Sequence, residues 1–362
     1  MSKKQNKKNV IAKTSNKLFF VDDSPVFKFI DPNGNDKLSE MSGFDLQDLI
    51  ILIDEYYIQL RNRLGFEQYI TFGLELEFEN AMRDRIDRKL SEAFPNGDWR
   101  TKHDGSLHNG AEINSPILRD NETTWRNLDK VCSIVEPLAS IGKKSGGHIH
   151  IGTQILGNNK ESWLNFIKMW SVYENIIFRF VYGEFLTARP SMLEYAEPMT
   201  RDFWKDYEKL KNDNASLEAI ISRISHQRYQ AVNFNNVLSH NCNSFRTKNT
   251  IEFRCPNGSL NSAIWQNNVN FFVKFLTYSR NTSFNDDLVQ QRHQINLDKF
   301  AGLKWYDEIY LEQALELCDM IFTNNFDKVY FLRQYLKSFE ISKKNTDYSK
   351  ARAITKKEIK NS

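Results

Sequence analysis

Hydrophobic and polar residues alternate with a period of two along several short stretches of this chain. Residues 70–79 read Ile-Thr-Phe-Gly-Leu-Glu-Leu-Glu-Phe-Glu, and residues 147–155 and 249–255 follow the same rule. Because successive side chains of a strand point to opposite faces, this pattern predicts strands with one apolar face. Further strands are predicted around 98–104, 111–118 and 228–238.

Other segments carry apolar residues at helical spacing. Residues 44–64 have such a stripe, which predicts a helix. It is formed by Leu46, Leu49, Ile50, Ile53, Tyr57 and Leu60. Helices are also predicted over 80–94, 121–140, 160–182, 202–224 and 262–280, and the chain beyond about residue 300 is mostly helical. Residues 1–40 are polar and interrupted by prolines, which is typical of a tail followed by a loop.

The strands come in pairs or threes separated by helices, without strict β-α-β alternation. This order predicts the α+β class, with a largely antiparallel sheet backed by helices. We divide the chain into an N-terminal tail and helical extension (1–66), a central domain (67–285) and a mainly helical C-terminal region with a basic tail (286–362).

The composition is that of a soluble globular protein. Among 362 residues, 40% are hydrophobic and 13% aromatic, which is enough apolar material for a substantial core. The net charge is only +3, and much of the excess lies in the lysine-rich ends. Since no interior basic stripe accompanies these lysines, we interpret them as solvated tails and expect no nucleic-acid partner.

The cysteines and the apolar runs indicate a cytoplasmic protein. None of the four cysteines belongs to a C-x-x-C pair, and a chain of this size needs no disulfide framework. Residues 1–17 contain lysines without the apolar stretch of a secretory signal. The longest apolar run, Leu49 to Ile53, is far too short to cross a bilayer, so we expect no membrane partner.

Three carboxylates, Glu75, Glu77 and Glu79, alternate along the first predicted strand. They share one face, because the residues between them are apolar and belong to the core. Like charges at this spacing repel, and a divalent cation would turn the repulsion into attraction, since hard cations bind carboxylate oxygens. A solvated strand face is the alternative interpretation.

Two histidines alternate in the same way. His148 and His150 follow a Gly-Gly pair and share a face, with Ile149 and Ile151 on the other. Such a pair can ligate one metal ion, or one imidazole can ligate while the other meets a phosphate. The glycines permit a close approach of backbone or ligand.

Two further segments carry charged residues that suit the same chemistry. Glu252 and Arg254 share a face of the strand at 249–255, as a metal-ligating carboxylate and a guanidinium that stabilises a phosphoryl group would. Asp104 lies in an Asp-Gly turn, and Glu112 lies among small and apolar neighbours, where an acid needs a partner. The sequence has no G-x-G-x-x-G after a strand and no P-loop, so ATP would bind on another kind of surface.

Taken in order, these segments resemble the motif series of the amidoligase family, which is grouped with glutamine synthetase and glutamate–cysteine ligase. The motifs are Gly73-x-Glu75-x-Glu77, Asp104-x-Ser106 with Gly110-x-Glu112-x-x-Ser115-Pro116, Gly147-His148-x-His150 and Thr250-x-Glu252-x-Arg254. The resemblance covers roughly residues 70–265. It implies a glutamine synthetase-like curved antiparallel sheet whose concave face holds ATP and two or three Mg²⁺ or Mn²⁺ ions, and it makes the central domain the catalytic one.

The resemblance also implies a set of metal ligands. Glu75, His148 and Glu252 would hold the ion nearer the ATP phosphates. Glu77 and Glu112 would hold a second ion, nearer the substrate.

The remaining assignments concern nucleotide and substrate. By the same resemblance, Arg254 would brace the γ-phosphate during transfer, and His150 would lie near the phosphates. Arg228 and Arg246 are candidates for further phosphate or carboxylate contacts. Asp104 would orient the amine or support a metal.

The implied enzyme is an ATP-dependent carboxylate–amine ligase. ATP phosphorylates a carboxylate, and an amine then displaces phosphate from the acyl phosphate, which gives an amide or peptide-like bond. The substrates would be small-molecule or peptide carboxylates and amines, and a homo-oligomer is left open. No segment resembles the ammonium site of glutamine synthetase, which disfavours ammonia as the amine.

Three other interpretations stay open. A guanidino-kinase-like phosphotransferase would share the fold and phosphorylate nitrogen. A metal-dependent hydrolase would use His148 and His150, with Glu75 or Glu77, on zinc and would need no nucleotide, although no H-E-x-x-H motif favours it. A non-catalytic binding protein is disfavoured, because the charges that share a strand face need a counterion.

Overall fold

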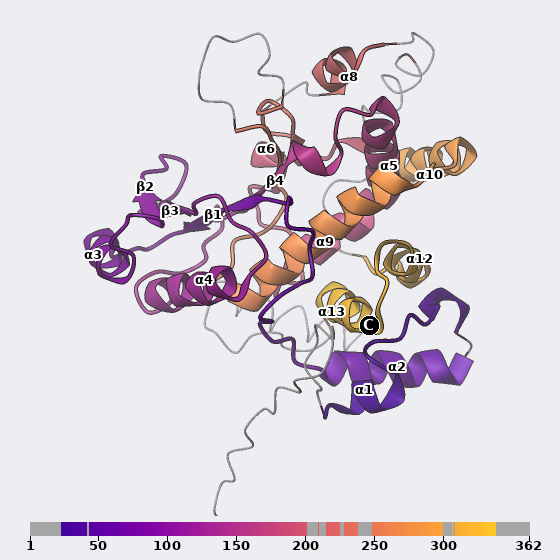
Figure 1. The fold of residues 1–362 in the computed structure, drawn as a ribbon, viewed down its shortest axis with the longest axis horizontal. Helices are drawn as coiled ribbons and strands as arrows, with labels where there is room; N and C mark the ends of the chain where they lie inside the picture. Colours follow the sequence, from indigo (N-terminus) through magenta and orange to yellow (C-terminus); the bar gives the residue numbers. More distant parts are fainter. Residues whose placement is uncertain are drawn as a thin grey trace, which may run out of the picture.

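The computed structural model describes residues 23–41, 43–200, 209, 215–224, 228–237, 248–299, 306 and 308–337. Within these residues the chain forms a six-stranded sheet with helices packed on one face (Figure 1). All of its strand pairs are antiparallel, which confirms the predicted α+β class and the antiparallel sheet.

The strand that carries the acidic residues lies inside the sheet, between the two strands that supply its partners. The strands are β1 (Phe72–Phe78), β2 (Arg100–Lys102), β3 (Ala111–Asn114), β4 (Gly147–Gly152), β5 (Val232–Asn233) and β6 (Thr250–Phe253). Their order is β2-β3-β1-β4-β6-β5. Each predicted strand contains an observed one, and the outermost strands are the shortest.

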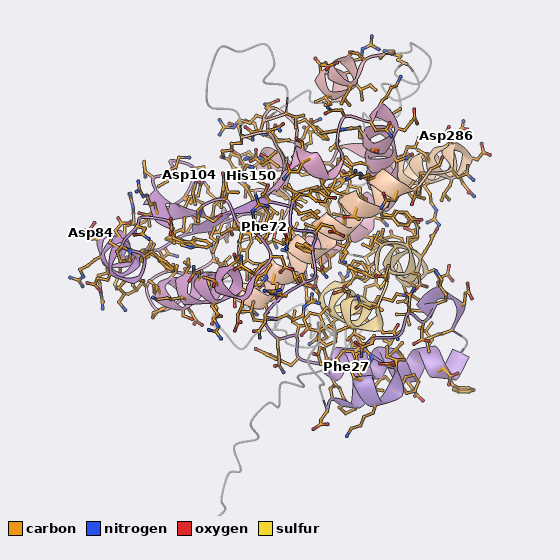
Figure 2. The ribbon with its side chains drawn as sticks, viewed as in Figure 1. Phe27, Phe72, Asp84, Asp104, His150 and Asp286 are labelled. Atoms are coloured by element: carbon orange, nitrogen blue, oxygen red, sulfur yellow. The ribbon has the colours of Figure 1, made fainter. Side chains whose placement is uncertain are left out.

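The apolar face of the sheet packs against α4 (Glu122–Val135), α5 (Lys160–Val181) and α9 (Ser262–Asn281). The Phe72 ring of β1 stacks on Trp125 of α4, and the Phe253 ring of β6 stacks on Phe272 of α9, 3.9 Å between centroids. Figure 2 shows Phe72 on the helix side of the sheet, whereas Asp104 and His150 lie away from α4. The alternation along the strands therefore separates an apolar face from a polar one.

Gly147 is explained by packing against a helix. A Cβ atom at this position would collide with the ring of Trp265 in α9. The Gly-Gly pair was predicted to permit a close approach. At Gly147 the group that approaches β4 is a buried tryptophan.

The first and last described helices pack on each other. The Phe27 ring stacks on Phe326, and Arg61 Nη1 lies 2.6 Å from Asp327 Oδ1 in a buried ion pair. The elements outside the sheet and its three covering helices are α1 (Pro25–Phe29), η1 (Leu38–Glu40), α2 (Gly43–Glu55), α3 (Arg83–Ala93), η2 (Thr153–Ile155), α6 (Met192–Tyr195), α8 (Leu217–Ile224), α10 (Asp286–Lys299), α12 (Leu311–Ile321) and α13 (Asn325–Leu336). None of the helices in the described part of the chain has the length and apolar character of a membrane span.

Two predictions near the N-terminus were wrong. The helix predicted over 44–64 ends at Glu55, because the backbone that follows takes other partners: the carbonyl of Tyr56 accepts from Arg333 Nε, and the N–H of Gln59 donates to the hydroxyl of Tyr330. The predicted loop before residue 40 contains the short helix α1. The lysine-rich ends, and most of the predicted helix before Leu217, lie outside the described residues.

Candidate active site

The register of the sheet sets the geometry of the site. Glu75 of β1 pairs with His148 of β4, and Glu77 pairs with Glu112 of β3. His150 pairs with Glu252 of β6. Because paired residues of antiparallel strands project from the same face, side chains from four strands meet on the face opposite the helices.

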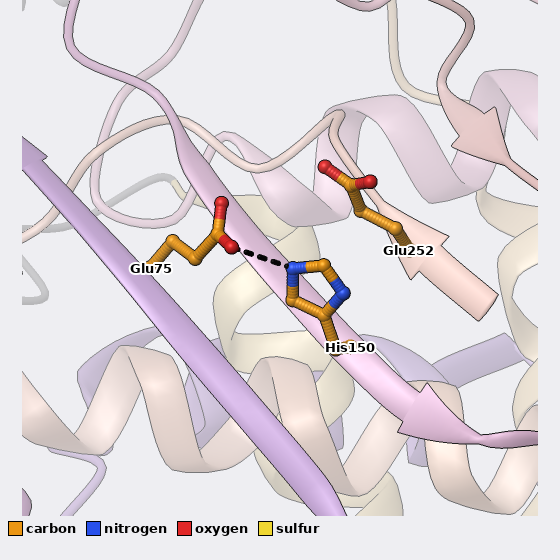
Figure 3. Close-up of side chains that lie close together, drawn as sticks. All are labelled: Glu75, His150 and Glu252. Atoms are coloured by element: carbon orange, nitrogen blue, oxygen red, sulfur yellow. Dashed lines mark hydrogen bonds and ion pairs between the residues drawn. The ribbon is translucent and has the colours of Figure 1, made fainter. Parts of the chain in front are cut away.

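The first group of potential ligands comprises Glu75, His150 and Glu252, whose ligand atoms all lie within 4.8 Å of one another. They come from three neighbouring strands, and His150 Nε2 lies 2.9 Å from Glu75 Oε1 (Figure 3). His148 borders this group, with Nδ1 2.8 Å from Glu75 Oε2 and 3.6 Å from Glu252 Oε1. Both imidazoles therefore lie beside Glu75 and Glu252, where the sequence predicted only that of His148.

The second group comprises Glu77, Asp104 and Glu112, again with ligand atoms within 4.8 Å. Asp104 Oδ1 accepts hydrogen bonds from the backbone N–H and the hydroxyl of Ser106, which fixes the turn. Among the described residues, Glu112 Oε1 is buried without a hydrogen-bond donor, and Lys102 Nζ lies 3.7 Å away. Burial and the charge of Glu75 raise the pKa of Glu112. A buried, unsatisfied carboxylate oxygen is an atom that a hard cation would satisfy.

The first group is anionic. Burial disfavours the ionised form of Glu75, but hydrogen bonds from His148 and His150 outweigh it and hold the pKa well below its usual range. Burial likewise opposes ionisation of Glu252, and the charges of the two histidines and Arg254 lower its pKa. Carboxylates that stay ionised when buried suit a cation site.

Arg254 is a buried partner of the first group. Its Nη1 lies 2.5 Å from Glu252 Oε1, and its Nε donates to the carbonyl of Tyr195. On the other oxygen of Glu252, Asn233 Nδ2 donates at 2.7 Å. Asn233 was not among the residues predicted from the sequence, although it stands between two apolar residues as a polar residue facing the site would.

Most of these side chains line a cavity of about 440 Å³, called here the acidic cavity. Glu75, Glu77, Glu112, His148, Glu252, Arg254 and Asp104 all face it. Arg228 lines it from an exposed turn. Arg246 lies outside the described residues.

A second cavity of about 380 Å³ lies beside the first and shares Glu75 with it. His150 lines it, next to Gly73, whose missing side chain leaves room beside the imidazole. Lys248 lines both cavities, and its Nζ lies 3.0 Å from Glu75 Oε1. Lys248 was not among the residues predicted from the sequence, although it precedes β6 by two residues, in phase with Thr250 and Glu252.

Glu79, the third alternating carboxylate, fastens two loops. Its oxygens accept hydrogen bonds from the backbone N–H groups of His108 and Lys144, at 2.9 and 3.1 Å. Of the three alternating carboxylates, Glu75 and Glu77 therefore face the cavity, whereas Glu79 fixes the loops around it.

Comparison with known proteins identifies a family. The chain matches the sequence model of a family described as "Putative amidoligase enzyme" over residues 95–276. No curated protein matches it. Among solved structures, a bifunctional glutathione synthetase from Pasteurella multocida is similar with a TM-score of 0.40 and 14% identity, over 81% of this chain and 49% of that one. The chain thus spans about half of that synthetase, and a likeness this weak assigns neither fold nor function.

Proposed function

The chain belongs to the amidoligase family, enzymes that use ATP to form carbon–nitrogen bonds, and from this premise we propose a carboxylate–amine ligase acting through an acyl phosphate. We propose with it a glutamine synthetase-like sheet, a catalytic domain at 67–285 and a cytoplasmic location. The observation that carries the proposal is that two clusters of carboxylates, supplied mainly by neighbouring strands, meet around one cavity. A reaction between anionic substrates needs such a place for cations.

The two groups fit divalent ions. Glu75 and Glu252 would hold the first ion with the imidazoles that border them, and Glu77 and Glu112 the second, with Asp104 beside them. The unsatisfied oxygen of Glu112 supports this assignment. Mg²⁺ or Mn²⁺ bound there would supply charge neutralisation for the transferring phosphoryl group.

The proposed chemistry has two steps. The γ-phosphoryl group of ATP passes to a carboxylate oxygen, which gives an acyl phosphate and ADP. The amine nitrogen then bonds to the acyl carbon, the bond from that carbon to the phosphate oxygen breaks, and the nitrogen loses a proton. Asp104, half-buried at the wall of the acidic cavity, is our candidate to orient the amine and accept this proton.

Arg254 is positioned for the first step, the transfer of the γ-phosphoryl group. Its ion pair with Glu252 and its hydrogen bond to the carbonyl of Tyr195 fix the guanidinium before ATP binds. A donor fixed in advance stabilises developing charge without reorganising during the reaction. We therefore assign Arg254 to the γ-phosphoryl group.

The nucleotide is assigned to the second cavity. His150 lies at the border between that cavity and the first ligand group, so phosphates bound near it would reach both. The hydroxyl, amide and apolar groups of Thr71, Asn114 and Ile117 suit an uncharged nucleoside better than the acidic cavity does. Arg228 lines the acidic cavity but not the second one, so we assign it to a substrate carboxylate and not to the nucleotide.

Product analysis separates this ligase from the kinase-like alternative. The protein would be incubated with ATP, Mg²⁺ and pools of amino acids and short peptides, and ADP, phosphate and new products would be measured. A ligase releases ADP and phosphate in equal amounts and gives a product of the combined substrate masses minus water. ADP without phosphate, together with a phosphorylated product, would instead support the kinase. Failure to form ADP with any pool would contradict both.

A further inference from the structure

The acidic cavity has a cationic rim, formed by Lys102, Lys144 and Arg228. All three residues line the cavity and are exposed. They come from separate places: β2, the loop before β4 and the turn before β5. The cavity therefore has carboxylates inside and positive charges at its opening.

Two of the three rim cations are not neutralised by those carboxylates. Among the described residues, neither the Lys144 ammonium nor the Arg228 guanidinium pairs with an acid, and the contact of Arg228 is with the Tyr229 ring. Lys102 differs, because its Nζ lies 3.7 Å from Glu112 Oε1 and forms an ion pair with that carboxylate. Arg254, which is buried, and Lys248, which is exposed, also line the cavity but are paired with Glu252 and Glu75. The charges of Lys144 and Arg228 are thus available to a ligand.

The backbone that carries the rim is fixed. Lys102 is in register with Glu112 in the β2–β3 pair. The backbone N–H of Lys144 donates to Glu79, which also fastens the loop at His108. Two of the three cations therefore stand on segments that hydrogen bonds hold against the cavity.

We propose that the acyl substrate carries further carboxylates besides the one that is activated, and that the cationic rim binds them. This inference rests on the proposed ligase function, because it needs the reacting carboxylate inside the acidic cavity. A second carboxylate then remains at the opening, where it meets Lys144 and Arg228. The substrate class is an acidic peptide or a polycarboxylate, and the rim also attracts such anions past the acidic interior.

The test compares acidic dipeptides with their amide isosteres. Binding of Glu-Glu and Asp-Glu, and of Gln-Gln and Asn-Gln, is measured by calorimetry on the full chain with Mg²⁺ and a non-hydrolysable ATP analogue. We expect the acidic member of each pair to bind at least about tenfold more tightly, the scale of one charge-assisted hydrogen bond. Lys144→Gln and Arg228→Gln should each remove most of that preference without weakening the nucleotide analogue. Lys143→Gln is the matched control, because Lys143 is exposed but does not line the cavity.

Equal binding of acid and amide, or equal behaviour of the Lys144 and Lys143 variants, would overturn the inference. For any dipeptide that is turned over, the rim variants should raise KM about tenfold and leave kcat within about threefold. The proposed function fails separately, through absence of nucleotide binding or of ADP formation. Dipeptide binding still decides the role of the rim in that case, because it needs no turnover.

Discussion

Glu75 Oε1 lies 2.9 Å from Nε2 of His150 on the neighbouring strand. The same oxygen is 3.0 Å from the ammonium of Lys248, and Oε2 of Glu75 meets His148. One ionised carboxylate thus contacts an ammonium group and two imidazoles. A divalent ion at this place would compete with the ammonium for Glu75, so metal binding and Lys248 are linked.

The first prediction is that Glu75→Gln abolishes most of the stabilisation by metal. Mg²⁺ or Mn²⁺ at a hundred times its dissociation constant should stabilise the parent by about 2.7 kcal/mol. A neutral amide is a weaker ligand for a hard cation, so the increase in Tm should largely vanish in the variant. Glu92→Gln, at an exposed position of α3, should keep the parental increase. An undiminished increase in the Glu75 variant would exclude Glu75 from the metal site.

The second prediction is that Lys248→Met tightens metal binding in the absence of nucleotide. The Lys248 side chain is half exposed, so its pair with Glu75 is worth at most about 1 kcal/mol, which corresponds to roughly fivefold in affinity. Titration with Mn²⁺ alone, followed by electron paramagnetic resonance, measures the effect. Lys143→Met serves as the control for loss of a nearby exposed charge. Weaker Mn²⁺ binding in the Lys248 variant would mean that the ammonium supports the site.

Much of the site could be predicted because strand alternation is a strong signal. The period of two in β1, β4 and β6 places Glu75, His148 and Glu252 on one face, and antiparallel pairing then brings them together. Alternation gives the face of Asn233 but not its partner, because the contacts of Asn233 and Lys248 with Glu252 and Glu75 depend on where a two-residue strand and a turn lie in three dimensions.

The same reason limits the prediction of helix ends. The apolar stripe of residues 44–64 continues past Glu55, but the backbone after Glu55 bonds to Arg333 and Tyr330, which are far away in the sequence. Glu79 shows the limit for function, since its alternation with Glu77 is regular while its partners are loop N–H groups. A local pattern gives the face of a residue, and tertiary contacts decide its partner.

Asp319 fastens the N-terminal segment to the C-terminal helices. Its carboxylate accepts hydrogen bonds from the backbone of Leu38 and Ser39 and lies 2.7 Å from the buried ammonium of Lys328. Burial opposes ionisation, but these hydrogen bonds lower the pKa of Asp319. A carboxyl whose pKa is lower in the folded state contributes its full stability above the unfolded pKa, near 4 for aspartate. That contribution is lost as the pH falls through the lower, folded value.

The third prediction is therefore that Asp319→Asn reduces both stability and its pH dependence. At pH 7 the free energy of unfolding should fall by about 3 kcal/mol, because the Lys328 ammonium stays buried without its counter-charge. Between pH 5 and pH 2 the variant should lose less further stability than the parent. Urea unfolding across this range measures both effects, with the exposed Asp287→Asn as control. If the free energy of unfolding of the variant fell as steeply in acid as that of the parent, a group other than Asp319 would control the pH dependence.

The last prediction concerns Arg254, whose proposed contribution belongs to the transition state more than to the ground state. Arg254→Lys keeps a positive charge but loses the planar guanidinium that can hold Glu252 and a phosphoryl oxygen at once. We expect the variant to bind ATP within a few-fold of the parent and to form ADP at least about a hundredfold more slowly, the scale of losing one preorganised donor. Arg254→Met should be slower still.

Single-turnover ADP formation with a substrate found in the pools measures this effect, and Arg63→Lys, at an exposed position, is the control. Because Arg254 is buried against Glu252, each variant is first checked for the parental Tm, so that lost rate is not lost folding. If Arg254 only neutralised Glu252, the Lys variant would keep the parental rate while the Met variant lost stability. A Lys variant with the parental rate would thus exclude the catalytic role and leave Arg254 as a partner of Glu252 alone.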